Sequence, residues 1–127
     1  MPQYPPDFTI AEVAILERVA PFTMTSPERV QALIHSVRHI TKNRIEGDIV
    51  ECGVWRGGSM MAIALTLLAL NAADRHLYLF DTFEGMPPPA SEDVSFDGIP
   101  AARSMDQPIV KAYAGLQDVM AAIMTAP

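Results

Sequence analysis

The sequence predicts an α/β fold in which helices are followed by a βαβ unit with parallel strands. Two short apolar runs, residues 48–53 and 76–81, have the length and composition of buried strands, and each carries an acid at or near its end. Between them, Gly57-Gly58-Ser59 open an apolar stretch that continues to about Asn71, long enough for a helix. A strand, a glycine turn, a helix and a second strand in this order require parallel pairing through a right-handed crossover.

Two helices are expected ahead of the first strand. Thr9-Ile10-Ala11-Glu12 has the form of a capping box, and the helix that it starts should stop before Pro21. Ser26-Pro27-Glu28 is a second start signal, with a cap, a proline in the first helical position and an acid near the positive helix end. Apolar residues then recur at helical spacing: Val30, Leu33, Ile34, Val37 and Ile40.

Composition excludes several classes of protein. The chain has 127 residues, of which 50% are hydrophobic, and a formal net charge of -6. This is enough apolar material for a packed core, and an acidic chain without a run of basic residues is unsuited to gripping nucleic acid. The longest apolar run, residues 60–70, has about half the length that a bilayer crossing needs, and the proline-rich N-terminus lacks the pattern of a signal peptide. We therefore expect a cytoplasmic protein with no membrane partner.

The chain offers few metal-ligating or redox-active side chains. Its single cysteine, Cys52, lies in an apolar run, where a small buried thiol is expected. His35 and His39 are spaced to share a helix face, but no third ligand is nearby, so the pattern favours a partly exposed helix face over a metal site. Residues 82–102 are rich in proline and acids and indicate a functional lid or a mobile loop, while residues 107–124 show helical patches.

The glycine turn after the first strand is the candidate functional site. Ligands of open α/β sheets bind beyond the carboxyl ends of the strands, and both strand-end acids, Glu51 and Asp81, lie at that edge. Glycines at 53, 57 and 58 would let the backbone pass close under a ligand, because a Cβ there would occupy the ligand's space. An acid ending the second strand is placed to accept hydrogen bonds from a ribose diol. The pattern indicates a cofactor that carries adenosine.

The spacing of the turn discriminates among such cofactors. Dinucleotide-binding proteins use G-x-G-x-x-G, whereas Trp55 occupies the middle glycine position here, which argues against NAD. No Gly-Lys-Ser/Thr follows, so the turn is not a P-loop. A nucleotide- or NAD-binding Rossmann-type domain remains the enzyme-class alternative. The acid-x-Gly-x-x-x-Gly pattern resembles the first motif of class I S-adenosylmethionine (SAM) methyltransferases.

Three longer strings make the resemblance specific. Residues 20–29 (APFTMTSPER), 47–61 (GDIVECGVWRGGSMM) and 79–87 (LFDTFEGMP) resemble the macrocin O-methyltransferase family, and the similarity runs in order from about residue 19 to residue 97. The resemblance implies the N-terminal part of a Rossmann-like class I methyltransferase fold. It further implies SAM and a divalent metal, usually Mg²⁺, and a small-molecule acceptor: these enzymes methylate sugar hydroxyls on macrolides and related natural products.

The resemblance also implies cofactor-binding roles by position. Glu51 and the turn glycines would form the SAM loop, Asp81 would hold the ribose, and residues 23–25 would fold over the cofactor near its methionine end. Ser59 would donate to the cofactor carboxylate or serve only as a helix cap, and Met24 and Phe83 would touch the cofactor or be ordinary core. The implied cofactor-binding residues are Thr23, Met24, Thr25, Glu51, Gly53, Gly57, Ser59, Asp81 and Phe83.

The family's catalytic and metal-binding acids lie on later strands that have no counterpart in this sequence. No catalytic residue and no metal ligand is therefore assigned, and Mg²⁺ is expected only in the full-length enzyme. Asp93 and Asp97, in the acidic loop, are interpreted as solvated rather than as substitutes. We expect this chain alone to be inactive in methyl transfer.

The predicted organisation is an N-terminal helical cap segment over residues 1–46 and an incomplete SAM-binding α/β domain over residues 47–127, truncated before the third strand. Two parallel strands leave an apolar sheet face and edge uncovered, so we expect the chain to form a homo-oligomer or to belong to a longer enzyme. The non-enzyme alternative is a cofactor-binding or assembly module that lacks catalysis.

Overall fold

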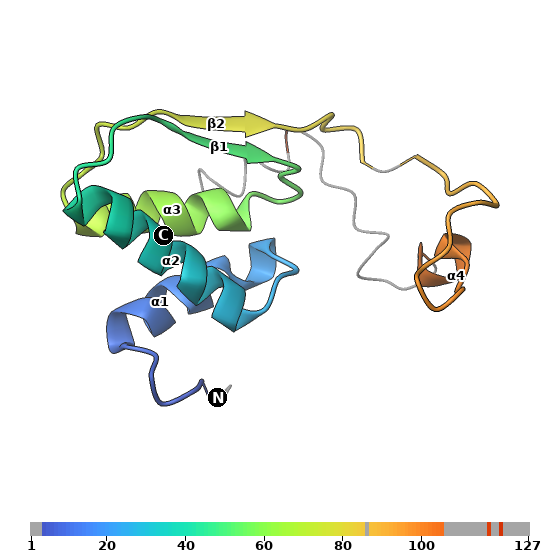
Figure 1. Ribbon diagram of the computed structural model, residues 1–127, viewed down its shortest axis with the longest axis horizontal. Coiled ribbons are helices and arrows are strands. Elements are labelled where there is room, and N and C mark those ends of the chain that lie inside the picture. The colour runs from blue at the N-terminus through green and yellow to red at the C-terminus, as the bar shows by residue number, and fades with distance from the viewer. Residues whose placement is uncertain (1–3, 86, 106–116, 118–119, 121–127) are drawn as a thin grey trace.

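A computed structural model describes residues 4–85, 87–105, 117 and 120. In chain order it contains α1 (Ile10–Val19), the 3-10 turn η1 (Ala20–Phe22), α2 (Pro27–Lys42), β1 (Ile49–Cys52), α3 (Gly58–Ala69), β2 (Leu77–Phe80) and the short α4 (Ala101–Met105). Figure 1 shows the helices α1, α2 and α3 on one side of the two strands, with α3 nearest the sheet and α1 farthest from it. The predicted α/β fold with a parallel βαβ unit is confirmed.

The capping box at the start of α1 is confirmed. The Glu12 amide donates to Thr9 Oγ1 at 3.3 Å, and the Thr9 amide donates to Glu12 Oε2 at 2.9 Å, so two free N–H groups of the first turn are satisfied. The α-helix ends at Val19, as predicted, but the chain continues through Pro21 as the 3-10 turn η1. Proline is tolerated there because a first-turn N–H has no helical partner to lose.

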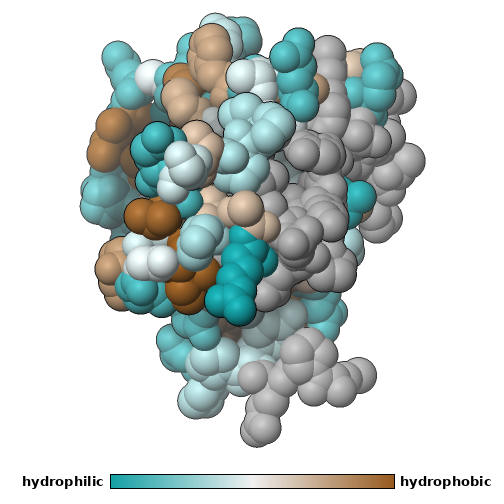
Figure 2. All heavy atoms as spheres, turned by 90° about the vertical axis from the view of Figure 1, so that its right-hand side faces the viewer, coloured by the Kyte–Doolittle hydropathy of each residue, from teal (hydrophilic) through white to brown (hydrophobic). Residues whose placement is uncertain are grey.

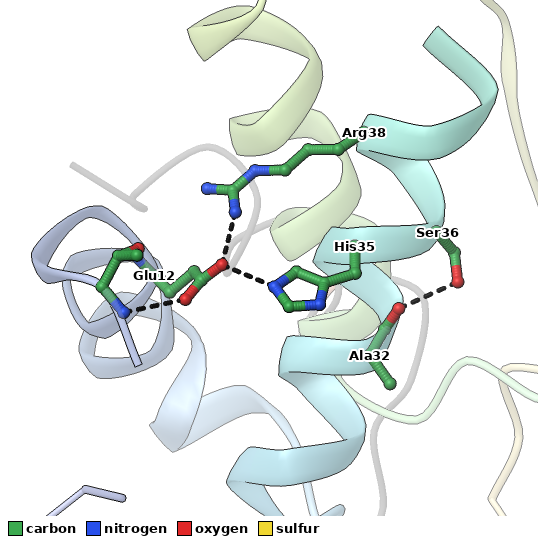
Figure 3. Close-up of polar contacts among 6 residues, drawn as sticks. Glu12, Ala32, His35, Ser36 and Arg38 are labelled. Carbon is green, nitrogen blue, oxygen red and sulfur yellow. Dashed lines mark hydrogen bonds and ion pairs between the residues drawn. The ribbon is translucent and has the colours of Figure 1, made fainter. Parts of the chain in front are cut away.

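Helix α2 turns its apolar stripe toward α1 and α3. Val30, Ile34 and Val37 are buried in it. On another face of the helix, His35 Nε2 lies 2.8 Å from Glu12 Oε1 of α1, and Arg38 donates to the same oxygen (Figure 3). His39 is exposed and lies against Asn43, with 3.3 Å between Nδ1 and the amide nitrogen. The two histidines therefore have separate polar partners, and the expected partly exposed helix face is confirmed.

Helix α3 packs against other elements on two of its sides, in agreement with its apolar residues all round. Met61 and Ala62 join the cluster of α1 and α2, while Met60, Ile63 and Leu67 pack with Val37 and with side chains of the sheet. Full burial of one such side chain is worth about 1.5–3 kcal/mol, so α3 couples the helical segment to the strands. The expected burial of this helix is confirmed, apart from its exposed last two residues, Leu68 and Ala69.

The two strands are covered on one face only. In the parallel register Val50 pairs with Tyr78 and Cys52 with Phe80, and all four side chains lie on the face turned away from α3. Val50, Tyr78 and Phe80 are 55%, 46% and 59% exposed. The expected uncovered apolar face of a two-stranded sheet is confirmed, because no described helix covers it. The expectation of a buried Cys52 thiol is wrong for the same reason, and neither strand is buried on both faces.

Beyond β2 the described chain is largely irregular. One isolated antiparallel bridge joins Val94 to Pro100 and closes a tight turn just before α4. In Figure 1 this part projects away from the helices and strands. Most of the predicted helical patch at residues 107–124 lies outside the described residues. Among the described residues, no helix has both the length and the apolar character needed to span a bilayer.

Candidate functional site

The carboxyl ends of β1 and β2 bring the two strand-end acids to one edge. The Gly53 amide donates to the Phe80 carbonyl at 2.8 Å, which extends the pairing one residue beyond β1 and places Glu51 and Asp81 near each other. Figure 2 views the molecule from the side to which the strands point. The described side chains there are a mixture of hydrophilic and hydrophobic groups.

Asp81 holds the turn that follows β1. Its Oδ2 accepts hydrogen bonds from the backbone amides of Val54 at 2.7 Å and Trp55 at 3.4 Å, and its Oδ1 accepts one from the Phe83 amide at 3.0 Å. The Phe83 and Val54 amides lower the pKa of Asp81, so the carboxylate is charged at neutral pH. Sequence reasoning assigned Asp81 to the ribose and missed this role. A carboxylate has about four acceptor positions, so room for a further donor remains.

Glu51 lies on the covered face of β1, beside the start of α3. Burial raises its pKa, a hydrogen bond from the Ser59 side chain lowers it, and the negative charge of Asp81 raises it. Its Oε2 is buried and has no hydrogen-bond partner in the described part of the chain. A buried carboxylate oxygen without a donor is costly, so a donor that reached this oxygen would stabilise the charged form of Glu51.

The turn itself is built from left-handed backbone. Gly53 and Gly57 have φ of +85°, where a side chain would be strained, and Gly57 is the N-cap of α3. A Cβ at Gly53 would meet no atom within 4 Å, in agreement with the expected open space. Trp55 also has a positive φ, of 50°, and the Arg56 guanidinium lies 5.6 Å from the centre of its ring.

At Gly58 the expected reason for a glycine is wrong. A Cβ there would lie 2.5 Å from the Phe22 carbonyl oxygen and 2.7 Å from Thr23 Cβ, so the space belongs to the protein's own chain and not to a ligand. We call residues 20–25, which include η1, the cap segment. Arg56 contacts it as well, since its guanidinium donates to the Pro21 carbonyl at 3.4 Å. Both contacts were missed at the sequence level.

The cap-segment residues have mixed exposure. Met24 is 56% exposed, so it is not part of the core, while Thr23 and Thr25 are half-buried. The Thr25 amide donates to Thr23 Oγ1 at 3.2 Å, which stiffens the segment. Thr23 and Thr25 also border a cavity of about 220 Å³ beside Val19 and Val30. Their contact with a cofactor stays a prediction.

Phe83 packs under the glycine turn. It is half-buried against Val54, next to Trp55 and Leu79. Its structural role is therefore clear, and its proximity to an adenine stays a prediction. Ser59 does not cap α3, because Gly57 is the N-cap and no side chain caps this helix, so that alternative is wrong. The Ser59 side chain lies close enough to Glu51 to lower its pKa, and its contact with a cofactor carboxylate stays a prediction.

No group of three or more His, Cys, Asp or Glu side chains in the described part of the chain is arranged to hold a metal ion. Asp93 accepts a hydrogen bond from the Ala90 amide at 2.8 Å, and Asp97 accepts one from the Ser95 hydroxyl, so both serve turns of the exposed loop. A cavity of about 920 Å³ lies at the opposite edge of the sheet, by Asp48 and Arg75, remote from the glycine turn.

Comparison with known proteins identifies relatives over part of the chain. Demethyldecarbamoylnovobiocin O-methyltransferase of Streptomyces niveus is 35% identical over 83 residues, which are 65% of this chain and 30% of that protein. Mycinamicin III 3''-O-methyltransferase of Micromonospora griseorubida is 33% identical over 75 residues, 59% of this chain and 30% of that protein. The chain thus spans about 30% of the length of the curated relatives it matches.

The solved structure of the O-methyltransferase NovP is similar over 81% of this chain and 41% of that chain, with a TM-score of 0.60 and 30% sequence identity. The Macrocin-O-methyltransferase (TylF) family model matches residues 17–114. This match includes the cap segment, the glycine turn and Asp81, so the family's sequence pattern and the edge described above coincide. The chain belongs to the macrocin O-methyltransferase family.

Proposed function

We propose that this chain is the SAM-binding portion of an O-methyltransferase that acts on a hydroxyl, in the first instance a sugar hydroxyl, of a small natural product such as a macrolide. The observation that carries the proposal is the edge formed by Glu51, the glycine turn and Asp81 in a chain of this family. The acceptor class is supported by relatives named for novobiocin, mycinamicin and tetracenomycin derivatives. Antibiotic biosynthesis in the cytoplasm is the corresponding context.

The free polar positions of this edge fit the two ends of SAM. The cofactor's α-ammonium group would supply the donor and the positive charge that Glu51 Oε2 lacks. The ribose hydroxyls would donate to the acceptor positions that Asp81 retains, and the open side of Gly53 would let the nucleoside approach the backbone. The cap segment, with Thr23, Met24 and Thr25, would then lie over the methionine end.

In the proposed reaction the acceptor oxygen attacks the methyl carbon of SAM. A C–O bond forms while the S–CH₃ bond breaks, the electron pair of that bond goes to sulfur to give S-adenosylhomocysteine, and the hydroxyl proton is lost to a base. Alignment of the two reactants would supply much of the acceleration. The described residues do not provide a set of metal ligands, so no step is assigned to Mg²⁺ here, and the ion belongs to the full-length enzyme by family resemblance alone.

We further propose that residues 1–46 act as the helical cap and residues 47–127 as part of the cofactor-binding domain. The exposed apolar side chains on the outer sheet face, Val50, Tyr78 and Phe80, support burial of that face in the working protein. Either further sequence of a longer enzyme or a second copy of this chain would cover it.

Isothermal titration calorimetry of the 127-residue chain with SAM and with NAD tests the proposal. We expect saturable heat with SAM and none with NAD, and Glu51→Gln should weaken SAM binding because the neutral amide does not attract an ammonium group. Glu84→Gln, which alters an exposed carboxylate beyond the turn, is the matched control. Binding of NAD in preference to SAM would favour the dinucleotide-domain alternative.

Methyl transfer from radiolabelled SAM to a glycosylated acceptor tests the catalytic part. We expect no turnover by this chain alone. Turnover by a longer natural form of the protein would separate an O-methyltransferase from a non-catalytic binding module, which would bind SAM without transferring the methyl group.

A further inference from the structure

The cap segment and the start of α3 approach each other more closely than any side chain would allow. The site of a Cβ on Gly58 lies 2.5 Å from Phe22 O, 2.7 Å from Phe22 C and 2.7 Å from Thr23 Cβ. Real Cβ atoms do not come this close to backbone atoms, so any other residue at position 58 must displace the cap segment or α3.

The helix does not itself need glycine at this position. Gly58 is the first residue of α3 and, unlike Gly53 and Gly57, does not have a positive φ. Alanine is favoured over glycine inside helices by up to about 1 kcal/mol, so the local backbone would accept a methyl group. The contact with Phe22 and Thr23 is therefore the reason for glycine.

A second link joins the same two segments. Arg56 lies between Gly53 and Gly57 in the turn, and its guanidinium reaches the Pro21 carbonyl at 3.4 Å while lying over the Trp55 ring. Asp81 holds this glycine turn by accepting a hydrogen bond from the Val54 amide. A chain of contacts thus runs from the end of β2 through the glycine turn to the cap segment.

The contact falls next to the candidate ligand position. Ser59, which follows Gly58, has a side chain close enough to Glu51 to lower its pKa, and Glu51 carries the buried oxygen without a partner in the described part of the chain. The cap segment therefore docks at the residue that precedes Ser59, close in sequence to the side chain that approaches Glu51, where a cofactor's ammonium group is proposed to bind.

We propose that Gly58 is a positioning residue that fixes the cap segment against the glycine turn, with Arg56 as its second attachment, so that Thr23–Thr25 form a preorganised wall for the amino-acid end of SAM. The inference rests on the proposed function for the identity of the ligand. The attachment itself is independent of any ligand, and preorganisation raises affinity because the ordering cost is met before binding.

The attachment of the cap segment, which needs no ligand, is tested by amide hydrogen exchange of the unaltered chain and of the Gly58→Ala variant. We expect faster exchange at the amides of residues 23–25 in the variant, including Thr25, whose amide is bonded to Thr23 Oγ1. Ala69→Ser is the matched control, because it adds one heavy atom at an exposed position of the same helix. Unchanged exchange at residues 23–25 in a folded Gly58→Ala protein would overturn the proposal.

The functional part compares SAM with 5′-methylthioadenosine, which keeps the adenosine and the methylated sulfur but lacks the amino-acid portion. Gly58→Ala should weaken SAM about ten-fold or more and 5′-methylthioadenosine less than about two-fold. Equal weakening of both ligands, or of neither, would contradict the inference. If the unaltered chain binds neither ligand, the proposed function fails, and the exchange measurement still decides whether Gly58 holds the cap segment.

Arg56 provides a second variant in case Gly58→Ala does not fold. Arg56→Gln should weaken the binding of SAM more than that of 5′-methylthioadenosine, as Gly58→Ala does, but by a smaller factor. Arg56→Lys should regain part of the lost SAM affinity, because an ammonium group can still donate to the Pro21 carbonyl. Arg29→Gln, on the exposed face of α2, controls for loss of a positive charge. A lysine variant no better than the glutamine variant would remove Arg56 from the attachment.

Discussion

Asp81 Oδ2 lies 2.7 Å from the Val54 backbone nitrogen, and this hydrogen bond joins the end of β2 to the glycine turn that follows β1. The two residues are far apart in the sequence, yet their contact decides the shape of the turn. Val54 is buried under that turn, so the amide is withdrawn from water and needs an acceptor within the protein.

Asp81→Ala should therefore destabilise the ligand-free chain. Removing the acceptor of the Val54 and Phe83 amides should lower the free energy of unfolding by about 1–3 kcal/mol, measured by urea denaturation at pH 7. Asp74→Ala, in the exposed turn before β2, should change it by less than about 0.5 kcal/mol. Similar losses for the two variants would mean that the Asp81 bonds do not hold the turn.

The same contact has a defined pH dependence. Amide donors lower the pKa of Asp81 below its ordinary value of 3.8, so the carboxylate stabilises the fold above pH 3.8 and this contribution is lost as the pH falls through the lowered pKa. The difference in unfolding free energy between the unaltered chain and Asp81→Ala should shrink in that range. A difference that stays constant from pH 7 down to the pH at which the unaltered chain unfolds in acid would contradict the assignment.

Glu12 should be the carboxylate on which attachment of α1 to α2 depends most. It is 1% exposed; burial raises its pKa, but hydrogen bonds from the Thr9 amide, His35 and Arg38 together lower it from 4.5 to about 2 (Figure 3). Its contribution is present above pH 4.5 and is lost as the pH falls from 4.5 towards 2. Glu12→Gln should cost on the order of 2–3 kcal/mol at pH 7 in urea denaturation.

The control for Glu12 is Glu17→Gln, an exposed carboxylate on the same helix. It should leave the free energy of unfolding within about 0.5 kcal/mol of the starting value. If Glu12→Gln changes the free energy of unfolding as little as Glu17→Gln does, the buried charge of Glu12 is not stabilised by its partners on α2.

The contribution of Glu51 to stability should have the opposite pH dependence to those of Asp81 and Glu12. Burial raises its pKa, so the charged form weakens the ligand-free fold, and stability should fall as the pH rises through the raised value. Glu51→Gln should raise the free energy of unfolding at pH 7 by up to about 1 kcal/mol while weakening SAM about ten-fold, as measured by thermal denaturation with and without SAM. A variant that is both less stable and unchanged in SAM affinity would exclude the proposed role.

The exposed sheet face should govern self-association. If a second copy covers it, Phe80→Lys should reduce the mass measured by light scattering to that of the 13.9 kDa monomer at concentrations where the unaltered chain is larger. Leu68→Lys is the matched control, because Leu68 is 61% exposed on α3, away from that face. A monomeric unaltered chain would show that a second copy does not cover the face.

Local patterns in the sequence were sufficient for α1, α2, α3, the two strands and their order, but not for η1 or α4. The capping box at Thr9, the proline at the start of α2 and the two apolar runs around the glycine turn each act within a few residues, and all are confirmed. The longer strings around positions 23, 53 and 81 were sufficient for the family. Such features depend on backbone propensity and on residue identity, both of which can be read directly from the chain.

Only the tertiary structure decided what the polar and glycine positions do. Glu12 was predicted as a helix cap, yet it also receives His35 and Arg38 from α2. Gly58 was predicted to make room for a ligand, yet it makes room for Phe22 and Thr23, and Asp81 first holds the Val54 amide. These partners lie more than twenty residues away along the chain, and hydrogen bonding and close packing depend on distance in space, which the packing of α3 between the helices and the sheet establishes.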